Sequence, residues 1–454
     1  MSNVVPDLDC AIQAQAAARP GKLWLSWRCL VIGTTLVAYS VPSAAVALAV
    51  LLVKGRDAAS RRLYRSLAGL LQRLGPTFVK FGQIMSSRRD ALPSGLCDEL
   101  SVLHDAVTPM TKKQTIHALT SAFGAGKDAM FHPGELTLIA SGSIASVFYA
   151  PWRGGGGLAL KLQRPGIRRL MTADLSLLEG IVRLAERLPK CKGMPLGDLM
   201  AFVSRAILGQ LDFVREAANL ARIRRGLFTI PHLVIPAVVT EASVPGCLVM
   251  EFIPGLDARN VDAHTPESRQ ELAITALHAV RKMIFMEGFV HCDLHPGNLY
   301  VTRGGEVVVL DAGFSVQLPD RVRQLIAEFF MELARGNGRR CAEIIIESAV
   351  RIRPGTKLES FTAAVSALVK QHTDPEAEPF AMMNFGNSLF DLQREYGLYA
   401  ESDFAFPLMS LAIIESTLRG ISPDLDFKEL GRMASAPINY DLQSRKEGTR
   451  ELVQ

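Results

Sequence analysis

The chain has 454 residues, with 50 lysines and arginines against 45 aspartates and glutamates, which gives a formal net charge of +5. This length is sufficient for a two-lobed domain with additional segments, and the small charge, with no basic stripe interleaved with aromatic residues, excludes an obvious nucleic-acid partner. The mean hydropathy of +0.19 leans towards a membrane-associated protein, and seven scattered cysteines without metal-ligand spacing indicate reduced thiols.

The N-terminal part of the chain contains one long apolar segment. Residues 1–28 are predicted to be a poorly ordered juxtamembrane N-terminus, and an uncharged run follows over 29–53. At about 1.5 Å per residue this run exceeds a hydrocarbon core of about 30 Å, so it is a candidate transmembrane helix. More basic residues follow the run than precede it, which places the next domain on the cytoplasmic side. A shallow hairpin bent at Pro42 and a helix covered by protein are the alternatives.

Helical spacing of apolar residues resumes at Ala58, and a second helix begins at Gly75-Pro76 with proline in its first turn. On the second helix one face is apolar, whereas Lys80 and Gln83 share another face. Such a polar face is most often simply solvated. Residues 58–130 are therefore predicted to form a helical extension in which these two side chains gain a role only from their context.

A strand, a turn of small residues and a second strand are predicted over 136–150. Small residues allow backbone N–H groups to approach phosphate oxygens closely. The residues predicted to bind nucleotide in this turn are Ala140, Ser141, Gly142 and Ser143. An ordinary hairpin turn is the alternative interpretation.

The next predicted strand contains Lys161 between apolar residues, which is unusual for a solvent-facing lysine. A kinase lysine grips the α- and β-phosphates and needs a glutamate partner from a helix. Glu216 is the candidate partner, and two amphipathic helical patterns, Leu175 to Leu188 and Leu196 to Ile207, lie between the two residues in the sequence. Further on, the backbone of Glu251 to Ile253 is predicted to face adenine at the end of a strand.

Two more helical regions are predicted in the rest of the chain. A helix from about Pro266 to Glu287 leads into the next motif, and the chain that follows Gly313 is predicted to be helical to about Phe427.

The segment from Gly288 to Gly313 contains the constellation that phosphoryl transfer requires. Asp293 in a His-x-Asp loop is predicted to orient the nucleophile, while Asn298 and Asp311 are predicted to hold Mg²⁺ against the phosphates of ATP. Catalysis of this kind depends on positioning and on neutralising charge in a polyanionic transition state. These three side chains supply the required chemistry.

The form His-x-Asp-x-His-Pro-Gly-Asn over 291–298, together with Lys-x-Gly-Gln over 80–83, resembles the UbiB/ADCK family of atypical kinase-like proteins. The resemblance covers roughly Leu74 to Phe427. It implies an α+β, protein-kinase-like two-lobed fold with an N-terminal helical extension. The implied small lobe with a helical insert is 131–253, the large lobe is 254–430, and 431–454 form a loose tail. It also implies that the helix with Lys80 and Gln83 folds over the nucleotide site.

The chain departs from the family pattern at three positions: Gly142 replaces an alanine, Gln210 replaces a glutamate and Ala312 replaces a phenylalanine. In addition, a helical pattern follows Gly313 almost at once, which leaves no room for the long segment that seats a peptide in protein kinases. Peptide phosphorylation is therefore disfavoured.

The function that the resemblance implies is ATP-dependent support of ubiquinone biosynthesis, as an ATPase or a kinase of a lipid-like or quinone-precursor molecule. Its implied cofactors are ATP and Mg²⁺, and other quinone-biosynthesis proteins are implied partners. The expected location is the inner membrane with the kinase-like domain facing the cytoplasm, or else its periphery. The alternatives are a small-molecule phosphotransferase of the aminoglycoside/choline kinase type and a catalytically weak nucleotide- or lipid-binding scaffold, which Gln210 and Ala312 favour.

Overall fold

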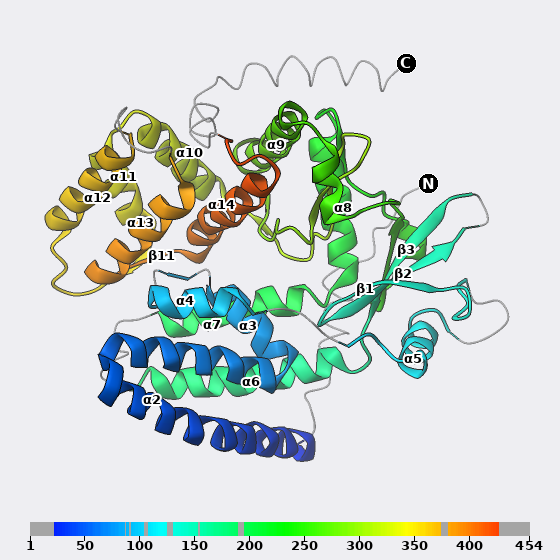
Figure 1. Ribbon diagram of the computed structural model, residues 1–454, viewed down its shortest axis with the longest axis horizontal. Coiled ribbons are helices and arrows are strands. Elements are labelled where there is room, and N and C mark those ends of the chain that lie inside the picture. The colour runs from blue at the N-terminus through cyan, green and yellow to red at the C-terminus, as the bar shows by residue number, and fades with distance from the viewer. Residues whose placement is uncertain are drawn as a thin grey trace, which may run out of the picture. The chain divides into compact units, whose positions relative to one another are not determined.

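The computed structural model describes residues 22–86, 88–89, 92–103, 108–124, 130–152, 155–188, 195–373 and 380–425 (Figure 1). The described chain mixes helices and strands and forms two compact units. The first unit comprises the residues up to 221 together with 236–254 and 311–314; the second comprises 222–235, 255–310 and the residues from 315 onwards. Of the predicted poorly ordered N-terminus 1–28, residues 1–21 lie outside the described residues, whereas residues 22–28 are helical, so the prediction is wrong over this stretch. The predicted tail 431–454 lies outside the described residues, and the predicted domain boundaries stay predictions.

The first unit contains a four-stranded antiparallel sheet in the order β1-β2-β3-β5. Its strands are β1 (Thr137–Ser141), β2 (Ala145–Pro151), β3 (Gly157–Gln163) and β5 (Cys247–Glu251). Leu160, Leu162 and Val249 are fully buried in one hydrophobic core, to which α5 (Lys112–Phe123) also contributes side chains. The predicted strand, turn and strand over 136–150 are confirmed.

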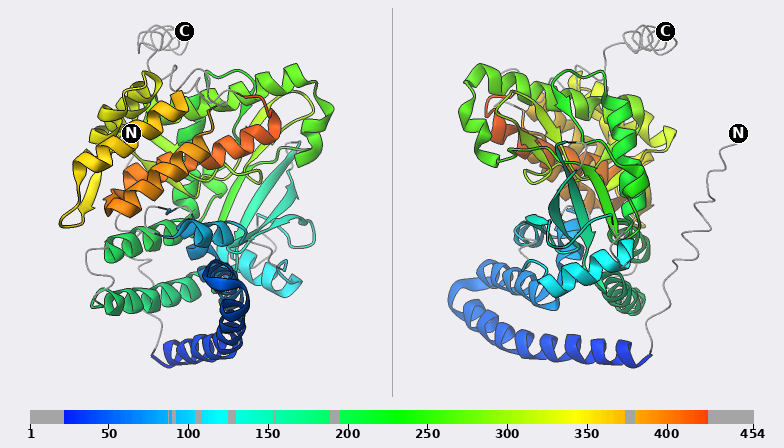
Figure 2. Two further views of the ribbon diagram at one scale, coloured as in Figure 1. Left: turned by 60° about the vertical axis from the view of Figure 1, so that its left-hand side comes forward. Right: turned by 90° about the vertical axis from the view of Figure 1, so that its right-hand side faces the viewer.

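The N-terminal extension of the first unit is built from α2 (Lys22–Leu74), α3 (Pro76–Ser86) and α4 (Ser94–Ser101). The helix α2 continues through Pro42 without interruption, so the predicted alternative of a hairpin bent at this proline is wrong. The bend lies at Gly55, whose φ of 80° and ψ of −177° only glycine adopts readily. The bend divides α2 into a first arm (22–54) and a second arm (56–74), which lie side by side (Figure 2).

A buried ion pair attaches the first arm of α2 to α6 (Ile167–Ala185). Arg28 donates to both carboxylate oxygens of Asp174, at 2.6 and 2.8 Å, and to the carbonyl of Leu74 at 2.8 Å. The hydroxyl of Thr77, in the first turn of α3, donates to the same carboxylate at 2.7 Å. Asp174 is completely buried. One carboxylate therefore holds three helices together, because a buried charge is tolerated only when its hydrogen bonds are satisfied.

The helical insert of the first unit consists of α6 and α7 (Leu196–Gly209). α6 begins at Ile167, eight residues before the predicted start at Leu175. Its first two turns carry a polar residue, Asp174, on the buried face beside Met171 and Leu175, so the apolar pattern is interrupted before Leu175. α8 (Phe213–Leu227) follows the insert and contains Glu216.

The second unit is mainly helical around a core of buried phenylalanines. Its helices are η3 (Ala258–Ala263), α9 (Pro266–Arg281), η4 (Lys282–Glu287), α10 (Asp320–Ala334), α11 (Gly338–Glu347), α12 (Leu358–Thr373), α13 (Met382–Tyr396) and α14 (Ser402–Ile421). The helix predicted over Pro266 to Glu287 is present, but its last turn, η4, is π-helical. This turn ends at Gly288, which has a φ of 58°. The chain thereby leaves the helix directly into the His-x-Asp segment.

Short strands frame that segment. The pairs are β6 (Phe289–His291) with β9 (Ser315–Gln317), and β4 (Leu233–Val234) and β7 (Leu299–Val301) on either side of β8 (Val307–Val309). The prediction that the rest of the chain is helical is wrong at β10 (Ala349–Ile352) and β11 (Leu398–Ala400), which pair antiparallel. Strands of three or four residues are too short to give a periodic signal.

Replacing Asp174 by alanine is expected to lower the free energy of unfolding of the first unit by about 3–5 kcal/mol, because Arg28 would stay buried without its partner. Urea unfolding followed by circular dichroism, with limited proteolysis of α2, measures the change. Glu99→Ala is the matched control: it removes the partner of the exposed Arg65 and should cost less than about 1 kcal/mol. An equal loss in the two variants would contradict a special role for the buried pair.

Candidate active site

Lys161 on β3 lies at the centre of a charged cluster in the first unit. Its ammonium donates to Glu216 Oε1 at 2.6 Å and to Asp311 Oδ2 at 2.8 Å. The lysine side chain is 15% exposed and the Glu216 side chain 1%, whereas Asp311 is 37% exposed. The structure thus brings together three of the predicted site residues, from a strand, a helix and the Asp-Ala-Gly segment. Buried charges of this kind stabilise one another only at hydrogen-bonding distance.

The electrostatics of the cluster follow from one cation between two carboxylates. Burial raises the pKa of Glu216 to about 8, and the neighbouring Asp311 charge adds to this shift, while Lys161 opposes it. Burial by itself would lower the pKa of Lys161, but the charges of Asp311 and Glu216 outweigh it and the net pKa is raised. Lys161 is therefore permanently cationic. Near pH 7 the raised pKa keeps Glu216 largely protonated, so the charges of Lys161 and Asp311 balance, and an added cation would favour the ionised form of Glu216.

Gly313 marks the point where the acidic side chains meet. A Cβ atom there would lie 3.2 Å from Asp311 Oδ1, 3.5 Å from Glu216 Oε2 and 3.7 Å from Gln210 Cγ. Glu216 Oε2 is buried and makes no hydrogen bond to the described residues. A buried carboxylate oxygen without a donor is unusual and fits a site for an added cation. Gln210, where the family resemblance implied a glutamate, makes this site less negative by one charge.

Asp311 is held in a special backbone conformation. Its φ is 54°, in the left-handed region that non-glycine residues seldom adopt, and its Oδ1 accepts the Gly313 N–H at 2.8 Å. Aspartate tolerates this region because its short carboxylate can bond the backbone locally. Ala312, in place of the usual phenylalanine, is fully buried, and its carbonyl accepts from Asn219 at 3.0 Å. The segment is therefore fixed without an aromatic side chain.

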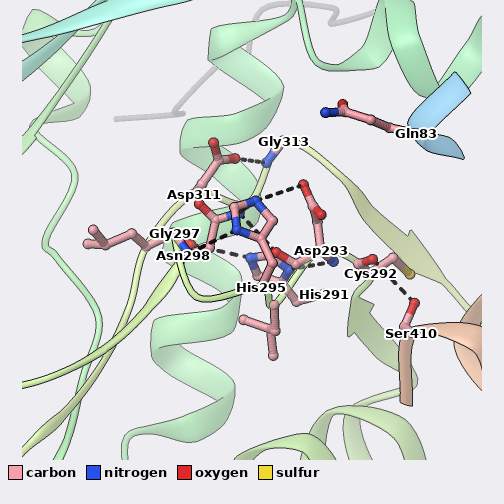
Figure 3. Close-up of polar contacts among 12 residues, drawn as sticks. Gln83, His291, Cys292, Asp293, His295, Gly297, Asn298, Asp311, Gly313 and Ser410 are labelled. Carbon is pink, nitrogen blue, oxygen red and sulfur yellow. Dashed lines mark hydrogen bonds and ion pairs between the residues drawn. The ribbon is translucent and has the colours of Figure 1, made fainter. Parts of the chain in front are cut away.

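The His-x-Asp loop lies in the second unit, between β6 and β7 (Figure 3). His291 is fully buried; its Nδ1 accepts the Asp293 N–H at 3.1 Å, so its Nε2 must carry the proton that faces the Leu310 carbonyl at 3.3 Å. The Asp293 side chain is 34% exposed and lies 3.8 Å from His295 Nε2. Backbone contacts thus orient the loop and leave the Asp293 carboxylate accessible.

Asn298 braces the same loop. Its amide donates to the Asp293 carbonyl at 2.9 Å, and its own carbonyl accepts the Leu310 N–H at 2.8 Å. These bonds set the loop against the segment that leads into the Asp-Ala-Gly turn. Asp293 and Asn298 belong to the second unit and Lys161, Glu216 and Asp311 to the first, so the predicted roles of the two groups stay predictions.

Helix α14 supports the loop, a contribution that the sequence analysis missed. Its Ser410 hydroxyl donates to the Cys292 carbonyl at 3.3 Å (Figure 3). Its Thr417 hydroxyl donates to the Leu294 carbonyl at 3.0 Å. Both side chains are buried. Because serine and threonine are common on helix faces and lie more than a hundred residues from the loop, no local pattern could have revealed them.

Arg164, in the Arg-Pro-Gly turn after β3, organises the small-residue turn and was also missed. It donates to the Gly142 carbonyl at 2.9 Å, to Ser141 Oγ at 2.8 Å and to the Thr108 carbonyl at 2.8 Å. The Gly142 N–H itself closes the turn on the Ala145 carbonyl at 2.8 Å. One guanidinium therefore ties the turn to the N-terminal extension. The sequence signal that could have indicated this role is an arginine directly before Pro-Gly at the end of a strand.

The other residues predicted for nucleotide binding are placed as follows. Ala140 is exposed, while the Ser143 hydroxyl is buried and makes no hydrogen bond to the described residues. At the end of β5, the Glu251 N–H bonds the Ala237 carbonyl at 2.8 Å, so it is occupied within the protein, and Ile253 is half-buried beyond the strand. The Phe252 N–H is also occupied, by the Gly157 carbonyl at 3.1 Å, so the predicted adenine edge narrows to the backbone of Ile253.

Lys80 and Gln83 lie on α3 in the first unit, and both are half-buried. The Gln83 amide donates to the carbonyl of Leu103, just after the end of α4, at 3.0 Å. Gly82, beside it, allows close packing: a Cβ there would lie 2.5 Å from Leu103. Neither side chain points to open solvent, but their predicted contact with nucleotide stays a prediction.

Comparisons with known proteins agree with the kinase-like fold. The family model for the ABC1 atypical kinase-like domain matches residues 102–345, more than half of the chain. A curated relative from Azotobacter vinelandii named probable protein kinase UbiB is 29% identical over 367 residues, which are 78% of this chain and 67% of the relative. The solved complex of Rv3197 with erythromycin from Mycobacterium tuberculosis has a TM-score of 0.54 at 20% identity, covering 84% of this chain and 97% of that one. At this identity the solved structure supports the fold alone.

Replacing Arg164 by alanine is expected to loosen the turn over 141–145, because three hydrogen bonds from a charged donor are lost. Such bonds contribute about 1.5–3 kcal/mol each, so amide exchange of the peptide containing 137–148 should accelerate at least about tenfold by hydrogen–deuterium exchange mass spectrometry.

Gly142→Ala is the control for this prediction. Its φ lies outside the left-handed region and its nearest neighbour, the Ala145 carbonyl, would be at an ordinary 3.6 Å, so exchange should stay unchanged. Unchanged exchange in the Arg164→Ala variant would show that the guanidinium does not organise the turn.

Proposed function

Because this chain belongs to the ABC1 family of atypical kinase-like proteins, we propose that it is an ATP-dependent phosphotransferase or ATPase that supports ubiquinone biosynthesis at a membrane. Membership of the UbiB/ADCK group and the kinase-like α+β fold are confirmed. The observation that carries the proposal is the contact of Lys161 with both Glu216 and Asp311. A lysine paired to a helix glutamate and positioned beside an Asp-x-Gly aspartate is the arrangement that grips nucleotide phosphates.

The charge of the cluster supports Mg²⁺ as the second component. Asp311, with Asn298 as its predicted co-ligand, would hold the ion, which supplies neutralisation of the phosphate charge when bound. Oxygen ligands of this kind are the ones that Mg²⁺ prefers. The acidic side chains around Gly313 and the unpaired Glu216 oxygen fit the ion, which would favour the ionised form of Glu216. Lys161, already cationic, would bind the α- and β-phosphates.

Asp293 is proposed to orient the attacking hydroxyl or water and to accept its proton. Its carboxylate is partly exposed, while its backbone is fixed through His291 and Asn298. A positioned carboxylate in this role contributes about 10²–10⁴-fold to a rate.

The acceptor is proposed to be a small or lipid-like molecule rather than a peptide. Only a short strand, β9, lies between the Asp-Ala-Gly turn and α10 at Asp320, so the described chain contains no long segment that could seat a peptide. The same observation favours a second candidate, a phosphotransferase for a small soluble molecule. A phosphorylated small molecule detected in cell extracts by mass spectrometry would select that candidate over quinone biosynthesis.

Asp293→Asn and Asp311→Asn are each expected to lower ATP turnover by about a hundredfold or more, because one removes the proton acceptor and the other a metal ligand. Phosphate release by the purified full chain, with detergent and a quinone-precursor mimic, is the assay. The same variants should fail to restore ubiquinone in a deficient strain, measured by lipid-quinone profiling.

The matched control is Asp262→Asn, an exposed aspartate of the second unit, which should retain full turnover. Normal complementation by Asp293→Asn and Asp311→Asn would rule out catalysis. If the wild-type chain binds nucleotide but releases no phosphate under any of these conditions, the scaffold alternative is correct instead.

Removing divalent metal with EDTA is expected to abolish ATP turnover, and added Mg²⁺ should restore it. In Asp311→Asn the Mg²⁺ concentration at half-maximal rate should rise about tenfold or more, because a charged ligand becomes neutral. A magnesium titration of turnover at fixed ATP measures this shift. Turnover that is insensitive to EDTA would contradict the metal role of Asp311.

A further inference from the structure

We propose that the first arm of α2 lies flat on an anionic membrane surface and does not cross the bilayer. This inference rests on the proposed membrane function and specifies its partner: a bilayer with acidic headgroups. It follows from three observations on the first unit, namely an exposed apolar face, a second face fastened to protein, and a group of basic residues next to both.

The first arm exposes one continuous apolar face. An 18-residue stretch of α2 has a mean hydropathy of 2.3, and only 6% of this stretch is buried within the protein. Apolar side chains that are 37–80% exposed recur along the arm: Leu30, Leu36, Val37, Val41, Val46, Leu48, Leu51, Leu52 and Val53. An apolar face of this length in water indicates a membrane or a partner, since isolated exposed leucines are common but long runs of them are not.

The opposite face of the same arm is fastened to protein over residues 24–39. The indole of Trp24 lies under the Arg169 guanidinium at 5.1 Å, Arg28 is buried against Asp174, and Ile32 packs into a cluster with Leu70, Leu74 and Phe78. Near the middle of the apolar run, Tyr39 contacts the second arm. The Arg73 guanidinium lies 4.9 Å from the Tyr39 ring, and a Cβ on Gly69 would collide with the Tyr39 hydroxyl.

These contacts are incompatible with a membrane-crossing first arm. Tyr39 packs against residues 69–73 of the antiparallel second arm. If the first arm crossed the bilayer, the second arm would therefore enter the bilayer with it. A crossing would carry the exposed Arg61, Arg62 and Arg65 into hydrocarbon, where each arginine costs a large transfer free energy. Releasing the first arm instead would leave Asp174 buried without Arg28.

A flat orientation satisfies both faces. The exposed apolar side chains enter the boundary between headgroups and acyl chains, as in other interfacial helices. The exposed basic residues at the bend and on the second arm then meet the headgroups: Lys54, Arg56, Arg61, Arg62 and Arg65. Each lysine or arginine near an acidic leaflet adds to the attraction, so the charge selects anionic lipid.

Membrane topology provides the first test. In a Cys29→Ser/Cys191→Ser background, Cys10 precedes the arm, and Lys54→Cys adds a thiol after it; the other four cysteines are buried. A membrane-impermeant maleimide is applied to bacterial spheroplasts expressing the full chain. The proposal expects both positions to be labelled only after lysis, because both ends of the arm lie on the cytoplasmic side. Labelling of either position in intact spheroplasts overturns it.

Vesicle binding provides the second test, with purified full chain and vesicles containing either 30% or no phosphatidylglycerol in phosphatidylcholine. Reversing the charge at Arg56, Arg61 and Arg62 (each Arg→Glu) is expected to weaken binding to the acidic vesicles by at least about tenfold. The matched control reverses three exposed arginines away from α2, Arg224, Arg225 and Arg339, and should bind as the wild type does.

The two tests separate this inference from the proposed function. Basal ATP turnover in detergent should be equal in the wild type and in both charge-reversed variants, because none of the altered residues belongs to the catalytic cluster. Equal binding to neutral and acidic vesicles, or equal loss in the two variants, overturns the inference while leaving catalysis intact. Absent turnover with intact binding would instead reject the proposed function alone.

Discussion

The contact of one ammonium group with two carboxylates is the interaction on which the first unit depends. Lys161 lies on a central strand, Glu216 on a helix 55 residues further on and Asp311 150 residues further on. The sheet positions the lysine, and the lysine in turn fixes the helix and the Asp-Ala-Gly turn. Because burial raises the pKa of Glu216, the cluster is close to charge balance without ligands, and its carboxyl groups can still receive a cation while Lys161 receives a phosphate chain.

A second buried charge pair has a corresponding role at the other end of the first unit. Asp174 joins the insert helix α6 to both α2 and α3. The insert that lengthens this chain relative to ordinary kinases therefore has a structural purpose: it supplies the carboxylate that holds the helix containing Lys80 and Gln83. The apolar first arm of α2 is fastened through the same residue, so membrane contact and the position of α3 share one anchor.

Much of the site could be predicted because its chemistry is encoded in short motifs. Asp293, Asn298 and Asp311 are recognisable from local spacing, and the apolar residues around Lys161 marked a buried strand. The supporting residues could not be predicted in this way. Arg164, Ser410 and Thr417 act through backbone carbonyls, and a carbonyl acceptor leaves no trace in the sequence of its donor. The early start of α6 was missed for a related reason, since the buried polar residue Asp174 interrupts the apolar pattern of its first two turns.

The sequence by itself determined the order of the elements, the kinase-like motifs and the presence of an apolar segment long enough to span a membrane. Those properties depend on residues close together in the chain. Only the tertiary structure decided which charges pair, and that the apolar segment folds back at Gly55 with Arg28 buried against Asp174, 146 residues away. The physical reason is that the free energy of a buried charge depends on the partner that reaches it in space, and hydropathy summed along the chain contains no information about that partner.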